Sequence, residues 1–178
     1  ISRENFWQPF QNVINMFKLR LSYGSLGNQD VENYLYVERL PLGTNLPYIF
    51  GDARPNYVNM AGLVSPGITW EKVRTSNIGF DAGFLKNRLN VSFDYFIRNT
   101  SDMLGPAESY PTVLGTDVPK SNNASLTTTG FEFVIEWRDM IDDFSYSAKF
   151  MLADAVSTIT SYYNPQKLLS GAFYEGAR

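Results

Sequence analysis

The sequence predicts an all-β fold, an antiparallel transmembrane β-barrel of which residues 1–178 form a part. Three observations carry this prediction. Apolar and polar residues alternate in several segments of about ten residues, as in strands whose two faces meet different surroundings. Short and long connections between these segments alternate strictly, as do the periplasmic turns and extracellular loops of outer-membrane barrels. No apolar stretch approaches the roughly 18 residues that a membrane helix needs.

Composition excludes several kinds of chemistry. The chain contains no Cys and no His, which removes Ser-His-Asp and Cys-His nucleophilic sites, disulfide frameworks, and zinc sites built on thiolates or imidazoles. Its net charge of −3 offers no positive field for nucleic acid, so we expect no nucleic-acid partner. Acidic residues in the loops are expected to be solvated, and we predict no metal and no cofactor.

The first predicted strand spans residues 18–24. Leu19, Leu21 and Tyr23 form one face, and Lys18, Arg20 and Ser22 form the other. A long loop of residues 25–69 follows, which we expect to be extracellular.

The next two strands, residues 71–85 and 88–98, are predicted to form a hairpin. Lys86 and Asn87 connect them, and both must tolerate a positive φ for the turn to close. Closing it makes every apolar residue meet an apolar residue, and a slip of one residue would destroy that agreement. The predicted pairs are Phe84 with Leu89, Ala82 with Val91, Phe80 with Phe93, and Ile78 with Tyr95.

After a second long loop, residues 99–127, two further strands are predicted at residues 128–138 and 144–154. A four-residue turn, Met140 to Asp143, would join them. The predicted pairs are Trp137 with Tyr146, Ile135 with Ala148, Phe133 with Phe150, and Phe131 with Leu152. In this register Glu132 and Lys149 are diagonal neighbours that could form an ion pair.

Alternation alone also fits a rival, a soluble secreted β-sandwich that binds glycans through exposed aromatic residues. Strand lengths near the 9–11 residues that cross a bilayer favour the barrel. Large and aromatic residues near both ends of the strands suit the two interfacial girdles of such a barrel. The opposite face, with Asp81, Asp94, Glu132 and Lys149, suits a hydrated lumen.

Two groups of residues are candidates for a site. Asp81 and Asp94 share one face of a hairpin, but nothing in the sequence buries them, and we expect no catalysis and no enzyme. The long loops contain five tyrosines that are candidates for contact with a substrate, although packing between loops would explain each of them equally well. These are Tyr34, Tyr36, Tyr48, Tyr57 and Tyr110.

Several segments, in this order, resemble the SusC/RagA-like TonB-dependent outer-membrane transporters. The resemblance extends from about Lys18 to Thr160, and the order and spacing of the motifs carry it rather than any one of them. The motifs are Leu-Arg-Leu-Ser-Tyr-Gly-Ser-Leu-Gly-Asn-Gln at 19–29, Thr-Trp-Glu-Lys at 69–72, Asn-Ile-Gly-Phe-Asp at 77–81, Ser-Phe-Asp-Tyr-Phe at 92–96, Asp-Met-Leu at 102–104, Leu-Gly-Thr at 114–116, Asn-Asn-Ala at 122–124, Thr-Gly-Phe-Glu at 129–132, Trp137, and Asp-Phe-Ser-Tyr at 143–146.

The resemblance implies a multi-pass barrel of 22 strands in the outer membrane of a Gram-negative bacterium, with residues 1–178 in its C-terminal half. It implies that the barrel contacts outer-membrane lipid and imports oligosaccharides or peptides. The implied partners are a SusD-like surface lipoprotein that closes the outer mouth and the TonB complex that drives import. We expect the plug domain and the N-terminal region that contacts TonB to lie outside these residues.

Overall fold

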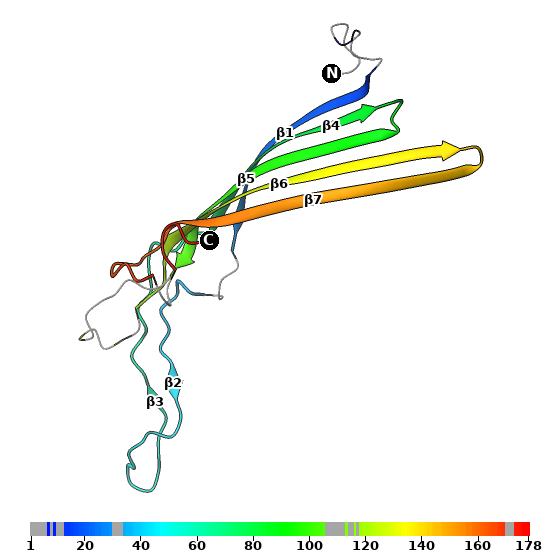
Figure 1. The fold of residues 1–178 in the computed structure, drawn as a ribbon. Helices are drawn as coiled ribbons and strands as arrows, with labels where there is room; N and C mark the ends of the chain where they lie inside the picture. Colours follow the sequence, from blue (N-terminus) through cyan, green and yellow to red (C-terminus); the bar gives the residue numbers. More distant parts are fainter. Residues whose placement is uncertain are drawn as a thin grey trace.

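The computed structural model describes residues 7, 9, 13–29, 34–105, 113, 116, 118–169 and 173–178. Within these residues the chain forms two antiparallel sheets (Figure 1). The large sheet has the strand order β1-β4-β5-β6-β7, and the small sheet pairs β2 with β3. The strands are β1 (Ile14–Asn28), β2 (Leu42–Gly43), β3 (Tyr57–Val58), β4 (Glu71–Phe84), β5 (Leu89–Gly105), β6 (Ser121–Ile141) and β7 (Phe144–Ser161). Among the described residues no helix is long and apolar enough to cross a membrane.

The five long strands lie side by side in one elongated, twisted sheet (Figure 1). The connections β4–β5 and β6–β7 lie together at one end of the sheet, which we call the turn end. The long connections leave from the opposite, loop end, and the small β2–β3 sheet projects beyond it as an arm. The alternation of short and long connections therefore sorts them to opposite ends of the sheet.

The strands continue beyond the segments in which apolar and polar residues alternate. β6 has 21 residues and β7 has 18, and both extend towards the loop end through stretches rich in Ser, Thr and Asn. Hydrogen bonds between neighbouring strands hold these stretches in the ladder without an apolar face. Alternation of apolar and polar residues therefore identifies only the part of each strand that has one apolar and one polar face, and the strand continues beyond it.

The predicted register of the first hairpin is confirmed. Phe84 pairs with Leu89, Phe80 with Phe93, and the remaining pairs follow. The turn contains Leu85, Lys86 and Asn87, with φ values of 51°, 60° and 65°. Three consecutive residues thus adopt the left-handed conformation, which L-residues other than Asn and Gly rarely adopt.

The predicted register of the second hairpin is wrong by two residues. Trp137 pairs with Ala148, not with Tyr146, and Phe131 pairs with Asp154, not with Leu152. The cause is a two-residue turn, Asp142-Asp143, in place of the expected four-residue turn. A slip of two residues keeps every side chain on its own face, so the hydrophobic pattern could not reject it.

Two consequences follow from the corrected register. Lys149 lies directly opposite Glu136, so the diagonal pair expected between Lys149 and Glu132 is not formed. Asp154 lies on the apolar face, near the side of that face towards the loop end.

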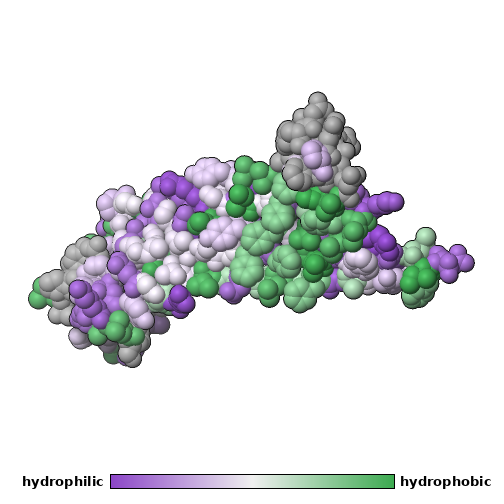
Figure 2. Space-filling view, turned by 45° about the horizontal axis from the view of Figure 1, so that its top comes forward, coloured by the Kyte–Doolittle hydropathy of each residue, from purple (hydrophilic) through white to green (hydrophobic). Residues whose placement is uncertain are grey.

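The apolar face of the large sheet carries a hydrophobic belt nearer the turn end than the loop end. Figure 2 shows this belt as a hydrophobic band with hydrophilic side chains on either side of it. Four phenylalanines cross it in an oblique ladder, with ring centroids 6.0 Å, 5.8 Å and 6.4 Å apart from each to the next. They are Phe17 on β1, Phe80 on β4, Phe93 on β5 and Phe131 on β6.

Within the described part of the chain, the Trp7 ring stacks on Phe17 at 5.2 Å, and no second sheet covers this belt. Ala82 is the one buried hydrophobic side chain there, whereas Leu21 is 70% exposed and Phe150 is 57% exposed. A sandwich would pack a second sheet over such a face at about 10 Å. The described residues form a single large sheet with an open apolar face, so the soluble sandwich is not their fold.

Candidate functional site

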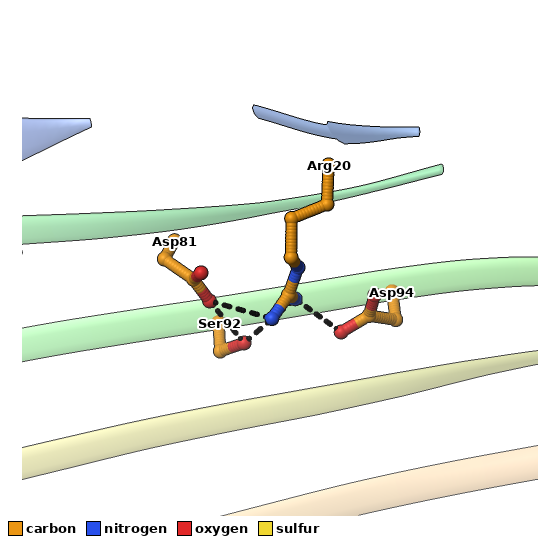
Figure 3. Close-up of polar contacts among 4 residues, drawn as sticks. All are labelled: Arg20, Asp81, Ser92 and Asp94. Atoms are coloured by element: carbon orange, nitrogen blue, oxygen red, sulfur yellow. Dashed lines mark hydrogen bonds and ion pairs between the residues drawn. The ribbon is translucent and has the colours of Figure 1, made fainter. Parts of the chain in front are cut away.

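The polar face of the large sheet holds a charged cluster that spans three strands (Figure 3). The guanidinium of Arg20 on β1 lies 3.2 Å from the Asp81 carboxylate on β4 and 2.5 Å from the Asp94 carboxylate on β5. Its Nη2 also donates to the Ser92 hydroxyl at 3.3 Å, and that hydroxyl donates to Asp81 at 2.8 Å. One cation therefore joins both carboxylates and the hydroxyl between them.

Gly79 makes this cluster possible. It lies directly opposite both Arg20 and Asp94, and it is buried beneath them. A Cβ added at Gly79 would collide with the Asp94 carboxylate and would approach the Phe93 carbonyl oxygen to 2.8 Å. Because Gly79 has no side chain, Arg20 can extend from β1 across β4 and contact Asp94 on β5.

The ion pairs with Arg20 explain why Asp81 and Asp94 lie near each other, and their placement needs no acid–base role to explain it. Asp81 and Asp94 share one guanidinium, and no apolar layer encloses them, since their side chains are 22% and 24% exposed. Within the described residues no three His, Cys, Asp or Glu side chains are arranged to hold a metal ion. These ion pairs tie β1, β4 and β5 together along the polar face.

The border of the belt at the turn end combines charges with aromatic rings. The Arg88 guanidinium lies 5.6 Å from the centre of the Trp137 ring and forms an ion pair with Asp139. The Tyr146 hydroxyl donates to the same carboxylate at 3.3 Å. Rings with one apolar part and one hydrated part are typical of a membrane–water interface.

A pocket of about 460 Å³ lies at the loop end, where β1 ends and β4 begins. Its volume is in the range of small-ligand sites. Residues from three separate segments supply its aromatic and polar lining: Asn28, Gln29, Tyr34, Tyr36, Trp70 and Glu71. We call this the loop-end pocket.

Side-chain amides hold the wall of the loop-end pocket in place. Asn122 accepts a hydrogen bond from the Thr69 amide at 2.9 Å and donates to the Thr69 carbonyl, also at 2.9 Å. It donates in addition to the Asp102 carbonyl at 2.5 Å. Asn28 donates to the Glu71 carboxylate at 3.1 Å, and Trp70 packs on Gly27. The segment that carries Trp70 and Glu71 is therefore fixed to β1, β5 and β6.

A second pocket, of about 360 Å³, has a mainly apolar lining that includes Leu126, Ile159 and Phe173. It lies near the loop end, where an irregularity in the pairing of β5 with β6 is close to one in the pairing of β6 with β7.

The structure separates the five candidate tyrosines. Tyr34 and Tyr36 line the loop-end pocket. Tyr48 is 74% exposed on the β2–β3 arm, and the Tyr57 ring covers Gly43 across the small sheet. Tyr110 lies outside the described residues.

Two features were missed by the sequence reasoning. The role of Arg20 could have been suspected from a glycine, Gly79, placed mid-strand beside Asp81 on an otherwise well-formed hairpin. The position of Trp70 in the loop-end pocket depends on the long connection folding back on β4, for which alternation gives no signal.

The comparisons with known proteins agree with this architecture. A family model described as "TonB dependent receptor-like, beta-barrel" matches residues 6–177. The chain is 31% identical over 151 residues to TonB-dependent receptor P3 of Formosa agariphila, and 30% identical over 161 residues to TonB-dependent receptor SusC of Bacteroides thetaiotaomicron. Each alignment covers 84% of this chain and 15% of the relative, so the chain spans about a seventh of the length of these relatives.

Solved structures give the same result. The structure of the RagAB peptide transporter superposes with a TM-score of 0.71 at 24% sequence identity, covering 91% of this chain and 17% of that one. The RagAB peptide importer in its "open-open" state gives a TM-score of 0.69 at 25% identity, covering 90% of this chain and 16% of that one. The open five-stranded sheet, with its belt on one face and its charged wall on the other, is part of a larger barrel, and the chain belongs to the TonB-dependent receptor β-barrel family.

Proposed function

We propose that this chain forms part of an outer-membrane nutrient importer. The whole protein takes up oligosaccharides or peptides, works with a SusD-like surface lipoprotein, and draws energy from the TonB complex through a region outside these residues. In this proposal the apolar face contacts outer-membrane lipid, and the polar face borders a hydrated path. The chain contributes to the wall and to the outer mouth, and it carries out no covalent chemistry.

The two-faced sheet is the observation that carries the proposal. On β5 the apolar face runs through Leu89, Val91, Phe93, Tyr95 and Ile97 without a polar interruption. The eight residue-to-residue steps from Leu89 to Ile97 correspond to about 27 Å along the strand, or about 21 Å of height at a tilt of about 40°. The side chains at the two ends add to this height, which supports a match with the roughly 25 Å apolar band of outer-membrane barrels.

The two cargo classes have different support. The solved structures are of a peptide transporter and a peptide importer, which supports peptides. Oligosaccharides follow from the resemblance to SusC/RagA-like transporters, and one relative bears the name SusC. We also propose that Tyr34 and Tyr36, which line the loop-end pocket, contact the cargo. The loop end would then face the cell exterior, and the turn end the periplasm.

Single cysteines in the full-length protein test this orientation. Residues 1–178 contain no native Cys. Once any Cys elsewhere in the full-length protein is replaced by Ser, Asp52→Cys on the arm and Asp142→Cys in the β6–β7 turn would each report one site. We expect an impermeant thiol reagent to label the first in intact cells, and to label the second only after the outer membrane is permeabilised. Labelling of Asp142→Cys in intact cells would overturn the orientation.

A deletion strain tests import itself. Loss of the full-length protein should abolish growth on its oligosaccharide or peptide cargo, and expression of the protein from a plasmid should restore growth. Unimpaired growth of the deletion strain on every cargo of both classes would overturn the import function.

A further inference from the structure

The loop-end pocket has the chemistry of a sugar subsite. We propose that it binds a pyranose ring of a neutral oligosaccharide. The inference rests on the proposed function, because it names the cargo class that this part of the mouth would recognise. Its supports are the exposed rings, the planar polar groups and the fixed backbone of the pocket.

Aromatic rings supply the first support. Tyr34, Tyr36 and Trp70 all line the pocket, yet they are 60%, 65% and 58% exposed. A large ring left in water gains free energy when an apolar surface covers it. One face of a pyranose ring carries C–H groups, so it can cover an aromatic ring while its hydroxyls stay at the periphery. The Arg39 guanidinium lies over the Tyr34 ring at 4.9 Å, so Tyr36 and Trp70 offer most of the open stacking surface.

Planar amides and a carboxylate supply the second support. Asn28, Gln29 and Glu71 lie among the rings. Glu71 accepts a hydrogen bond from Asn28 through its Oε2. Neighbouring hydroxyls on a sugar can donate to the two oxygens of one carboxylate and accept from an amide N–H group, because each hydroxyl is both donor and acceptor.

The fixed backbone is the third support. Asn122 binds both the amide and the carbonyl of Thr69, the residue before Trp70. Gly27 has an ideal Cβ position only 3.0 Å from the Trp70 ring, so the absence of a side chain there lets the indole pack on β1. A ring and a carboxylate held in place before the ligand arrives cost less ordering entropy on binding.

The charges around the pocket favour a ligand without net charge. Among the lining residues Glu71 is the one charged side chain, and the Arg39 guanidinium lies 4.9 Å from the centre of the Tyr34 ring. A carboxylate and a cation beside the same rings give no excess of one sign that would select an anionic or a cationic ligand.

The test is binding to the purified full-length protein. The probes are neutral glucose hexaoses with α-1,4, β-1,3 or β-1,4 linkage, measured by isothermal titration calorimetry, with a tryptic digest of casein as the peptide probe. Trp70→Ala and Tyr36→Ala remove pocket rings, and Phe50→Ala removes a 66% exposed ring on the arm as a matched control. All variants are first compared with the wild type for abundance in the outer membrane.

We expect at least one hexaose to bind, and each pocket variant to weaken that binding about tenfold, since a lost aromatic stack is worth roughly one such factor. The Phe50→Ala control should bind as the wild type does. Tyr36→Ala keeps the proposal testable if Trp70→Ala does not reach the membrane. Unchanged hexaose affinity in both pocket variants would overturn the assignment, and so would failure of all hexaoses to bind.

The sugar-site assignment and the import function can be refuted independently of each other. If the deletion strain loses growth on peptides, and Trp70→Ala weakens binding of the casein digest while no hexaose binds, the protein is an importer but the pocket is not a sugar site. If the deletion strain grows normally on every cargo, the import function fails, whatever the pocket binds.

Discussion

Replacing neighbouring residues on the two faces of β7 tests which face contacts lipid. Leu152 lies on the apolar face opposite Phe133, at the middle level of the belt, and Met151 lies on the polar face opposite Val134. Both side chains are exposed in this sheet, at 51% and 66%, and they are similar in size. Leu152→Lys and Met151→Lys therefore place the same charge at the same depth, one on each face.

The expected costs differ sharply. A lysine near the middle of the lipid-facing band of a membrane barrel costs about 2–4 kcal/mol, whereas a lysine facing a hydrated lumen costs little. Leu152→Lys should therefore lower the ratio of folded to unfolded protein roughly 30- to 700-fold. Met151→Lys should change the unfolding free energy by less than about 1 kcal/mol, as substitutions on a hydrated surface usually do.

The measurement is reversible denaturant unfolding of the full-length protein in phospholipid vesicles, with the midpoint and slope compared between variants. Replacement of Leu152 with Ser supplies a neutral control for the lost apolar contact. Equal losses for the two lysine variants would refute the assignment of the apolar face to lipid. A larger loss for Met151→Lys would show that the faces have been assigned the wrong way round.

Three further predictions concern the polar wall, the pocket and the first turn. Gly79→Ala should lower the unfolding free energy by about 1–3 kcal/mol because the new Cβ forces the partly buried Asp94 carboxylate off its Arg20 partner, whereas Gly24→Ala, with open space around it, should not; vesicle unfolding measures both. Asn122→Ala should speed hydrogen exchange of the Thr69 amide about tenfold, and an unchanged rate would show that the side chain does not hold this segment. Lys86→Gly should stabilise the protein by up to about 1 kcal/mol, because a residue with φ of 60° loses its left-handed strain, and a destabilised variant would contradict this.

The sequence predicted the register of one hairpin and not that of the other. Alternation of apolar and polar residues detects a slip of one residue but not a slip of two. The β4–β5 register followed from the position of the Lys86-Asn87 turn together with alternation, because a one-residue slip would have turned Phe80 and Phe93 to opposite faces. The β6–β7 register did not, because a two-residue slip leaves Phe133 and Phe150 on their face, and only the turn at Asp142 distinguishes the two pairings.

The candidate site was less predictable than the sheet. Asp81 and Asp94 were expected on one hydrated face, and that is where they lie. Their shared partner is Arg20, 74 positions before Asp94, and no local pattern connects residues so far apart. The loop-end pocket is assembled from four separate segments, so only the folded chain shows that Tyr36 and Trp70 belong to the same pocket and Tyr57 does not.

β6 is much longer than the belt is high, so one strand contributes both to the belt and to the loop end. Its 21 residues span about 71 Å, or about 54 Å of height at a tilt of about 40°, more than twice the height of the belt. In the proposed orientation, the part of β6 beyond the belt lies outside the bilayer and carries Asn122, which holds the wall of the loop-end pocket. Substitutions in that part would change the mouth without changing a side chain that the proposal places against lipid.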